Sequence, residues 1–279
     1  SYQGNQDPSD SYLAGFWNVG YLTINRVNLF LEGLAANPTV VPATTAANYR
    51  GEAKFLRAKF YFDLVRLFGN VPLIDHTLGA SEYYTVEQVG PDQIYPLIIS
   101  DLEDAIAVLP SSVSSNQLGR VTKGAAQALL ARALLFENDE NNMSQVASLC
   151  ESVIQSGEYS LLTSFADLWT ADGEWSSESV FEITYSENSA SDWGSFGWGG
   201  GEGNVGVQFI GMRDYNGPTY ATGWGFCPVS TELEAAMDGD NTDADNFLSI
   251  AKSLGGSGGG ARDLQLTEIP NAQTGKMHR

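Results

Sequence analysis

Apolar side chains recur at steps of three and four residues between residues 49 and 68, which is the spacing of one face of an α-helix. Phe55 and Phe62 lie beside this face and widen it, so the pattern predicts a helix that is buried on most sides. Gly69 tolerates a positive φ, and Pro72 forces the residue before it into an extended conformation, so we expect the helix to end at residue 68. The predicted face consists of Ala53, Leu56, Phe60, Leu64 and Phe68.

Helical spacing also occurs in the segments 12–34, 91–109 and 142–156. Another helix is expected to begin after Thr122, whose hydroxyl suits an N-cap, and its alanines between residues 125 and 133 allow a neighbouring helix to approach closely. The pattern therefore predicts a mainly α-helical fold built from antiparallel helical pairs. Such pairs resemble tetratricopeptide units, which bury their apolar faces by stacking on their neighbours.

The character of the chain changes after Tyr159. Residues 179–185 alternate between apolar and polar side chains, which predicts a short strand. Residues 189–225 are rich in Gly, Asn and aromatic residues, which is typical of ordered loops that bind sugars by stacking rings on them. The alternative is that several of these rings form the small core of this region. The stacking candidates are Trp193, Phe196, Trp198, Tyr215 and Tyr220.

Charge and composition exclude some classes of function. The chain has 279 residues, with 14 Lys and Arg against 34 Asp and Glu, and the net charge of -20 argues against a nucleic-acid partner. No spacing typical of a metal site occurs, and no apolar run reaches the length of a membrane span. Cys150 lies on an apolar stripe and is expected to be a small core residue, with a disulfide to Cys227 as the less favoured alternative.

Three short motifs resemble ligand sites, but their contexts do not fit. The glycine pattern at residues 201–206 follows a loop and precedes no amphipathic helix, so it does not predict a dinucleotide site. The string at residues 255–259 matches a nucleophile elbow only through its low complexity. The acidic turn at residues 238–243 lacks the glycine and the later glutamate of a helix-loop-helix calcium loop, so calcium binding there is only an alternative. We therefore expect no cofactor and no metal.

Several blocks of this sequence resemble the SusD/RagB family of outer-membrane lipoproteins. The segment at residues 49–74, which consists of the predicted helix and the extension after it, carries most of the resemblance, and the other blocks follow it in the family's order. The matching residues are GEA at 51–53, FLRA at 55–58, YFDLV at 61–65, FGNVPL at 68–73, RVTKGAAQALLARA at 120–133, VIQSGEYSL at 153–161, ESVFEI at 178–183 and GWGF at 223–226.

The resemblance implies a function and a division of the chain. It implies a non-catalytic protein on the outer membrane of Bacteroidota, which captures an oligosaccharide and delivers it to a SusC-like TonB-dependent transporter. A lipid on an N-terminal cysteine upstream of Ser1 would anchor it to the membrane. We expect a helical scaffold at residues 1–160, an irregular ligand-binding region at 161–240 and a poorly matching tail at 241–279. Because family members are longer, we also expect this chain to be part of a longer protein.

Two other functions remain open at the level of the sequence. A glycoside hydrolase would also combine aromatic subsites with a pair of carboxylates, and Asp192, Glu202 and Asp214 are available. A helical-repeat scaffold without a ligand is the other alternative, and it is favoured if the aromatic loops are buried. The sequence also leaves open whether the cargo is a glycan or a peptide.

Overall fold

The computed structural model describes residues 11–164, 167–168, 173–183, 213–214, 216 and 223–225. The chain divides into two compact units, and the described part of the first comprises residues 11–160 and 180–183. All the helices and strands named below belong to this first unit. The domain boundaries suggested by the sequence stay predictions.

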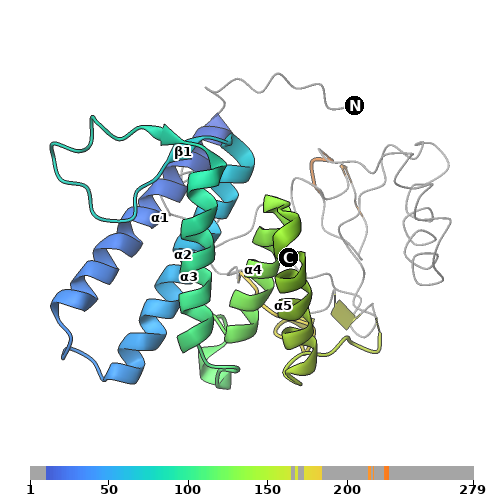
Figure 1. Cartoon of the computed structure of the whole chain (residues 1–279). Helices are drawn as coiled ribbons and strands as arrows, with labels where there is room; N and C mark the ends of the chain where they lie inside the picture. The colour runs from blue at the N-terminus through green and yellow to red at the C-terminus, as the bar shows by residue number, and fades with distance from the viewer. Residues whose placement is uncertain are drawn as a thin grey trace. The chain divides into compact units, whose positions relative to one another are not determined.

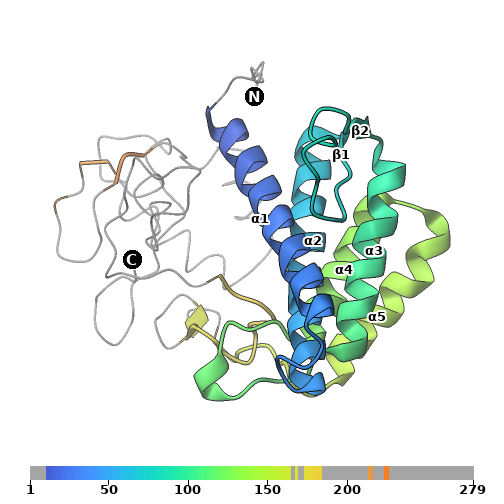
Figure 2. The same ribbon diagram turned by 90° about the vertical axis from the view of Figure 1, so that its left-hand side faces the viewer.

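Helices dominate the described part of the first unit and follow one another along the chain (Figure 1). Each helix packs against the next one, so α1 and α5 lie at the two edges of the array, as Figure 2 also shows. This arrangement confirms the mainly α-helical fold predicted from the sequence. The α-helices are α1 (Ser11–Ala36), α2 (Ala43–Phe68), α3 (Pro91–Val108), α4 (Lys123–Glu137) and α5 (Met143–Gln155), and two 3-10 turns cover Ser115–Gln117 and Glu140–Asn142.

The second helix, α2, forms the centre of the core, but its most buried face differs from the predicted one. Leu56 and Phe60 are only half-buried, whereas the face that carries Phe55, Tyr61 and Phe62 is almost fully buried. The predicted face was only partly right: Ala53 and Leu64 are buried, but α2 packs against both α1 and α3, so its buried arc is centred between these two neighbours. The helix ends at Phe68 as predicted, and Gly69 has a positive φ of 72°.

A two-stranded antiparallel ladder connects α2 to α3. Strand β1 (Val71–Pro72) pairs with β2 (Gln88–Val89), so that Val71 lies opposite Val89. The ladder closes residues 73–87 into a loop, which we call the hairpin loop. Val71 is fully buried, so the base of the hairpin loop is fixed to the core.

Local signals fix where α3 and α4 begin. Pro91 occupies the start of α3, where its missing N–H costs nothing, and Pro96 lies inside the helix on its exposed side. Thr122 caps α4 as predicted, because its hydroxyl accepts a hydrogen bond from the N–H of Ala125 at 3.2 Å.

The expectation for Cys150 was wrong. Cys150 on α5 is exposed and forms no disulfide among the described residues, and Cys227 lies outside them. Only one side of α5 packs on the core, through Val146 and Leu149. Ile154, on the predicted apolar stripe, is 75% exposed because no other described helix covers the outer side of this edge helix.

The expected strand at residues 179–185 is also not present where the structure describes it. Residues 179–183 form no ladder, and residues 184–185 lie outside the described part. Phe181 packs edge-on against Phe55 with ring centroids 5.2 Å apart, whereas Ile183 is exposed. Among its described residues, this segment packs on the core through Val180 and Phe181 and pairs with no strand.

Candidate functional site

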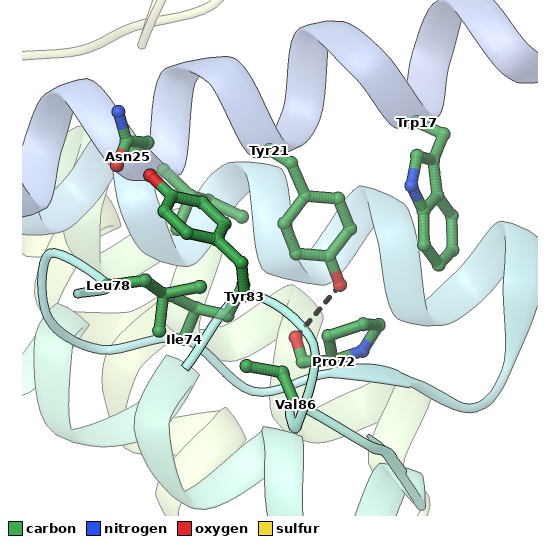
Figure 3. Close-up of a pocket in the computed structure, with 9 residues that line it drawn as sticks. Trp17, Tyr21, Asn25, Pro72, Ile74, Leu78, Tyr83 and Val86 are labelled. Carbon is green, nitrogen blue, oxygen red and sulfur yellow. Dashed lines mark hydrogen bonds between the residues drawn. The ribbon is translucent and has the colours of Figure 1, made fainter. Parts of the chain in front are cut away.

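A pocket of about 380 Å³ opens between α1 and the hairpin loop, and we call it the α1 pocket (Figure 3). Three of its residues are aromatic and one is an amide, and the remainder are aliphatic or proline. None of its lining side chains is charged. The lining residues are Trp17, Tyr21, Ile24, Asn25, Pro72, Ile74, Leu78, Tyr83 and Val86.

The helical wall of the α1 pocket follows from spacing in the sequence. Trp17, Tyr21 and Asn25 lie four residues apart, so they share one face of α1. The rings of Trp17 and Tyr21 are 4.9 Å apart, and Trp17 also meets Phe68 edge-on at 5.1 Å. These contacts hold the two rings in place, so this wall of the pocket is preformed.

Hydrogen bonds from two tyrosines hold the opposite wall. The Tyr21 hydroxyl donates to the carbonyl of Pro72 at 2.8 Å, as Figure 3 shows. Tyr61 donates to the carbonyl of Ile74 at 3.0 Å and accepts from the N–H of the same residue at 2.7 Å. Burial raises the pKa of Tyr21 and raises that of Tyr61 to about 12, so both hydroxyls remain protonated donors at neutral pH.

Behind this wall lies a buried cluster of Asn28, Arg57 and Asp101. Arg57 donates to Asp101 through Nε at 2.7 Å and Nη2 at 2.8 Å, and its Nη1 donates to the side-chain oxygen of Asn28 at 2.7 Å. The cluster reaches the hairpin loop, because Arg57 Nη1 donates to the carbonyl of Asp75 at 2.9 Å. Asn28 Nδ2 donates to the carbonyls of Ile74 at 3.1 Å and His76 at 3.0 Å.

The outer part of the hairpin loop is held by His76 and two glutamates. His76 contacts Asp75 through Nδ1 at 2.8 Å and Glu82 through Nε2 at 3.3 Å. Glu82 accepts from the N–H of Gly79 at 2.6 Å, and Glu32 on α1 accepts from the N–H of Thr77 at 2.7 Å. The hydrogen bonds with Asp75 and Glu82 raise the pKa of His76. These contacts position the segment that carries Tyr83.

The chemistry available in the α1 pocket is that of recognition. Aromatic faces and an amide suit a neutral polar ligand with apolar C–H faces. The described residues contain no group of three or more His, Cys, Asp or Glu side chains able to bind a metal. In the described part of the chain, no helix is long and apolar enough to cross a membrane.

A second hollow of about 380 Å³ lies at the start of α4 and has a different character. Its wall includes Lys123, Gln127, Gln155 and Glu158, so it is polar and charged. Its single aromatic residue is Tyr159, whose hydroxyl is hydrogen-bonded to the Thr122 hydroxyl at 2.8 Å. The α1 pocket is therefore the better candidate for binding by stacking.

The stacking residues predicted from the sequence lie outside the described residues: Trp193, Phe196, Trp198, Tyr215 and Tyr220. Arg213 and Gly223 form an isolated parallel bridge, and Arg213 Nε donates to the carbonyl of Trp224 at 2.9 Å. Residues 213 and 223, which flank the sequence segment that contains Tyr215 and Tyr220, are therefore neighbours in space.

The residues of the α1 pocket were not predicted as a site from the sequence. Trp17 lies in the segment 12–34, for which the sequence predicted only a helix, and its contact with Phe68 agrees with an apolar helix face. The available signal was Asn25, a polar residue one turn beyond Tyr21 on that face. Nothing in the sequence indicated that Tyr83 belongs to a site, because it reaches α1 only when the β1–β2 ladder closes the hairpin loop.

Comparison with known proteins agrees with the fold and the sequence blocks. A SusD-like family model, described as starch-binding and associating with the outer membrane, matches residues 1–135. A laminarin-binding SusD-like protein of known structure is 31% identical, with a TM-score of 0.78 over 92% of this chain and 60% of that protein. The chain is a SusD-like family protein.

Two further relatives are longer than the part that this SusD-like chain matches. Surface glycan-binding protein A from Bacteroides thetaiotaomicron, in complex with laminarihexaose, is 29% identical, with a TM-score of 0.73 over 86% of this chain and 51% of that protein. A SusD-like protein of Formosa agariphila is 26% identical over 172 residues, or 62% of this chain and 32% of the relative. The SusD-like chain thus spans about a third of that curated relative's length.

Proposed function

We propose that this protein captures a neutral oligosaccharide of the laminarin type at the cell surface. The observation that carries the proposal is the similarity to a laminarin-binding SusD-like protein across 92% of the chain. The laminarihexaose complex of a second relative supports the same ligand class. The uncharged, ring-lined α1 pocket is consistent with a neutral sugar, although the whole chain carries a net charge of -20.

The stacking surface of this proposal includes Trp193, Phe196, Trp198, Tyr215 and Tyr220. Flat rings in loops bind the apolar faces of sugar rings, and each such contact contributes roughly 1 kcal/mol. Replacing Trp193, Trp198 or Tyr215 by Ala should therefore weaken binding about fivefold and leave the melting temperature nearly unchanged. Equal losses of affinity and stability would show instead that these rings form a core.

The proposed role is capture without turnover. Hydrolysis requires two carboxyl groups on either side of one glycosidic bond. Of the three carboxylates considered from the sequence, Asp214 is described and exposed, and Asp192 and Glu202 lie outside the described residues. Full-length protein should bind a laminarin oligosaccharide in a calorimetric titration and release no reducing ends. Binding of a peptide pool but of no glycan would overturn the proposed ligand class, and multiple turnovers would support the hydrolase.

Delivery to a membrane transporter is the second half of the proposal. The family resemblance suggests that an N-terminal lipid holds the protein at the outer membrane and that a SusC-like TonB-dependent transporter receives the glycan. A pull-down with full-length lipidated protein from outer membranes should recover a β-barrel of that class, identified by mass. Recovery of soluble proteins alone, under conditions that preserve known membrane complexes, would reject this partner.

A further inference from the structure

We propose that the α1 pocket is a sugar subsite in its own right, which binds one or two rings of a neutral oligosaccharide through Tyr83, Asn25 and Trp17. This inference rests on the proposed glycan-binding function and adds a site on the helical scaffold. The predicted stacking residues, such as Trp193 and Tyr215, lie elsewhere in the sequence and play no part in it.

The size of the α1 pocket fits a small ligand. Its volume of about 380 Å³ is near the lower end of the range for small-molecule sites, which begins at roughly 300 Å³. Figure 3 shows Trp17 at one end, Tyr21 in the middle and Asn25 at the other end of the helical wall. The wall therefore offers an extended row of contacts instead of a single point.

Polar groups in the α1 pocket are available to a ligand. Among the described residues, the amide of Asn25 and the hydroxyl of Tyr83 form no hydrogen bond, nor does the indole N–H of Trp17. By contrast, the hydroxyl of Tyr21 is used to hold Pro72. A sugar hydroxyl both donates and accepts, so it can pair with an amide, a phenol and an indole in turn.

The absence of charge from the wall selects for a neutral ligand. The chain has far more acidic than basic residues, yet Glu82 is paired with His76, and both Glu82 and Glu32 accept hydrogen bonds from backbone N–H groups of the loop. An anionic glycan would find no cation in the lining, and it would meet Glu82 and Glu32 at the outer part of the loop. A neutral glucan meets neither problem.

The main alternative occupant is an apolar side chain from outside the described residues. Such a side chain would cover the polar groups of Asn25, Tyr83 and Trp17 without pairing with them. Leaving a buried polar group unpaired costs about 1–3 kcal/mol, so a ligand rich in hydroxyl groups fits the lining better.

The test uses full-length protein and a laminarin oligosaccharide in calorimetric titrations. Asn25→Ala and Tyr83→Ala should each weaken binding about fivefold, the effect expected for losing one stacked ring or one well-placed hydrogen bond. Both side chains are exposed, with Tyr83 at 61%, so their loss should leave the melting temperature unchanged. Tyr84→Ala is the matched control, because Tyr84 is adjacent in sequence, 94% exposed and absent from the lining.

The outcomes separate the two proposals. If wild-type protein binds the oligosaccharide and both pocket variants retain full affinity, the α1 pocket is not a subsite and the proposed function stands. A fall in melting temperature with unchanged affinity would identify the pocket as a seat for another part of the protein and would also overturn the subsite. If wild-type protein binds no neutral glycan, the proposed function fails first. Selective loss in Asn25→Ala and Tyr83→Ala, with Tyr84→Ala unaffected, supports the subsite.

Discussion

Arg57 on α2 and Asp101 on α3 form a two-point ion pair inside the core, with the Asp101 side chain only 1% exposed. Burial is the largest single influence on the pKa of Arg57 and lowers it, but the hydrogen bonds and the charge of Asp101 outweigh burial and raise this pKa overall. The pair joins two helices, and through Arg57 it also holds the carbonyl of Asp75. One interaction thus links the packing of the scaffold to the wall of the α1 pocket.

Removing one member of this pair should be strongly destabilising. Asp101→Ala leaves the guanidinium of Arg57 buried without its partner, which typically costs about 3–5 kcal/mol. Chemical denaturation monitored by circular dichroism measures the change in the free energy of unfolding. Asp104→Ala is the control, because Asp104 lies on the same helix and pairs with Lys54 at an exposed position. We expect that control to cost less than about 1 kcal/mol.

The two faces of α2 should respond differently to truncation. Phe62→Ala removes a side chain that is 1% exposed, so it should cost about 3–5 kcal/mol through lost burial and a cavity. Leu56→Ala, on the half-buried face, should cost about 1–2 kcal/mol, less than a fully buried leucine. Urea denaturation of both variants gives the comparison. Equal costs would mean that Leu56 is covered in solution by residues outside the described part.

Periodicity predicted the helices because each helix buries a stripe against its neighbours. The same reasoning failed for Cys150 and Ile154, which are exposed on α5. A single sequence shows that a face is apolar, but it does not show which other element covers it. The strand expected at residues 179–185 failed for a related reason: a ladder needs a partner, and Phe181 packs on Phe55 instead.

The candidate site was harder to predict than the fold. Trp17, Tyr21 and Asn25 lie together because of helical spacing, and this much was readable from the sequence. The opposite wall depends on Asn28 reaching the carbonyls of Ile74 and His76, 46 and 48 residues away in sequence. Every residue has a backbone carbonyl, so these hydrogen bonds do not require particular residue types in the loop. The sequence pattern therefore could not predict them.

Gly124 at the start of α4 should tolerate no side chain. A Cβ added there would lie 2.5 Å from Cε2 of Tyr159, whose hydroxyl is held by Thr122 at 2.8 Å. Gly124→Ala should therefore destabilise by about 1–3 kcal/mol, although alanine favours helix. Gly33→Ala on α1 is the control, since nothing lies within 4 Å of the position that its methyl group would occupy. That control should stabilise by about 0.5–1 kcal/mol, and equal behaviour of the two variants would contradict the close contact.

The histidine of the hairpin loop should titrate above its ordinary value. His76 lies between Asp75 and Glu82, and Glu32 on α1 adds a third negative charge nearby. Hydrogen bonds with the two loop carboxylates raise the pKa of His76 above 6.5, and no basic side chain among the described residues contacts its ring. Because the native pKa is raised, the stabilisation of the loop is fully present below pH 6.5 and is lost as pH rises through the native pKa.

Proton NMR titration of the histidine ring measures this pKa directly, and His76→Gln assigns the signal against that of the second histidine, His278. Glu82→Gln should lower the pKa of His76, because it replaces a carboxylate by a neutral amide that can no longer stabilise the imidazolium. Amide hydrogen exchange, corrected for its intrinsic pH dependence, should accelerate at residues 77–83 as His76 loses its proton. A pKa at or below 6.5, or one that Glu82→Gln leaves unchanged, would show that the bridge between His76 and Glu82 does not hold the loop in solution.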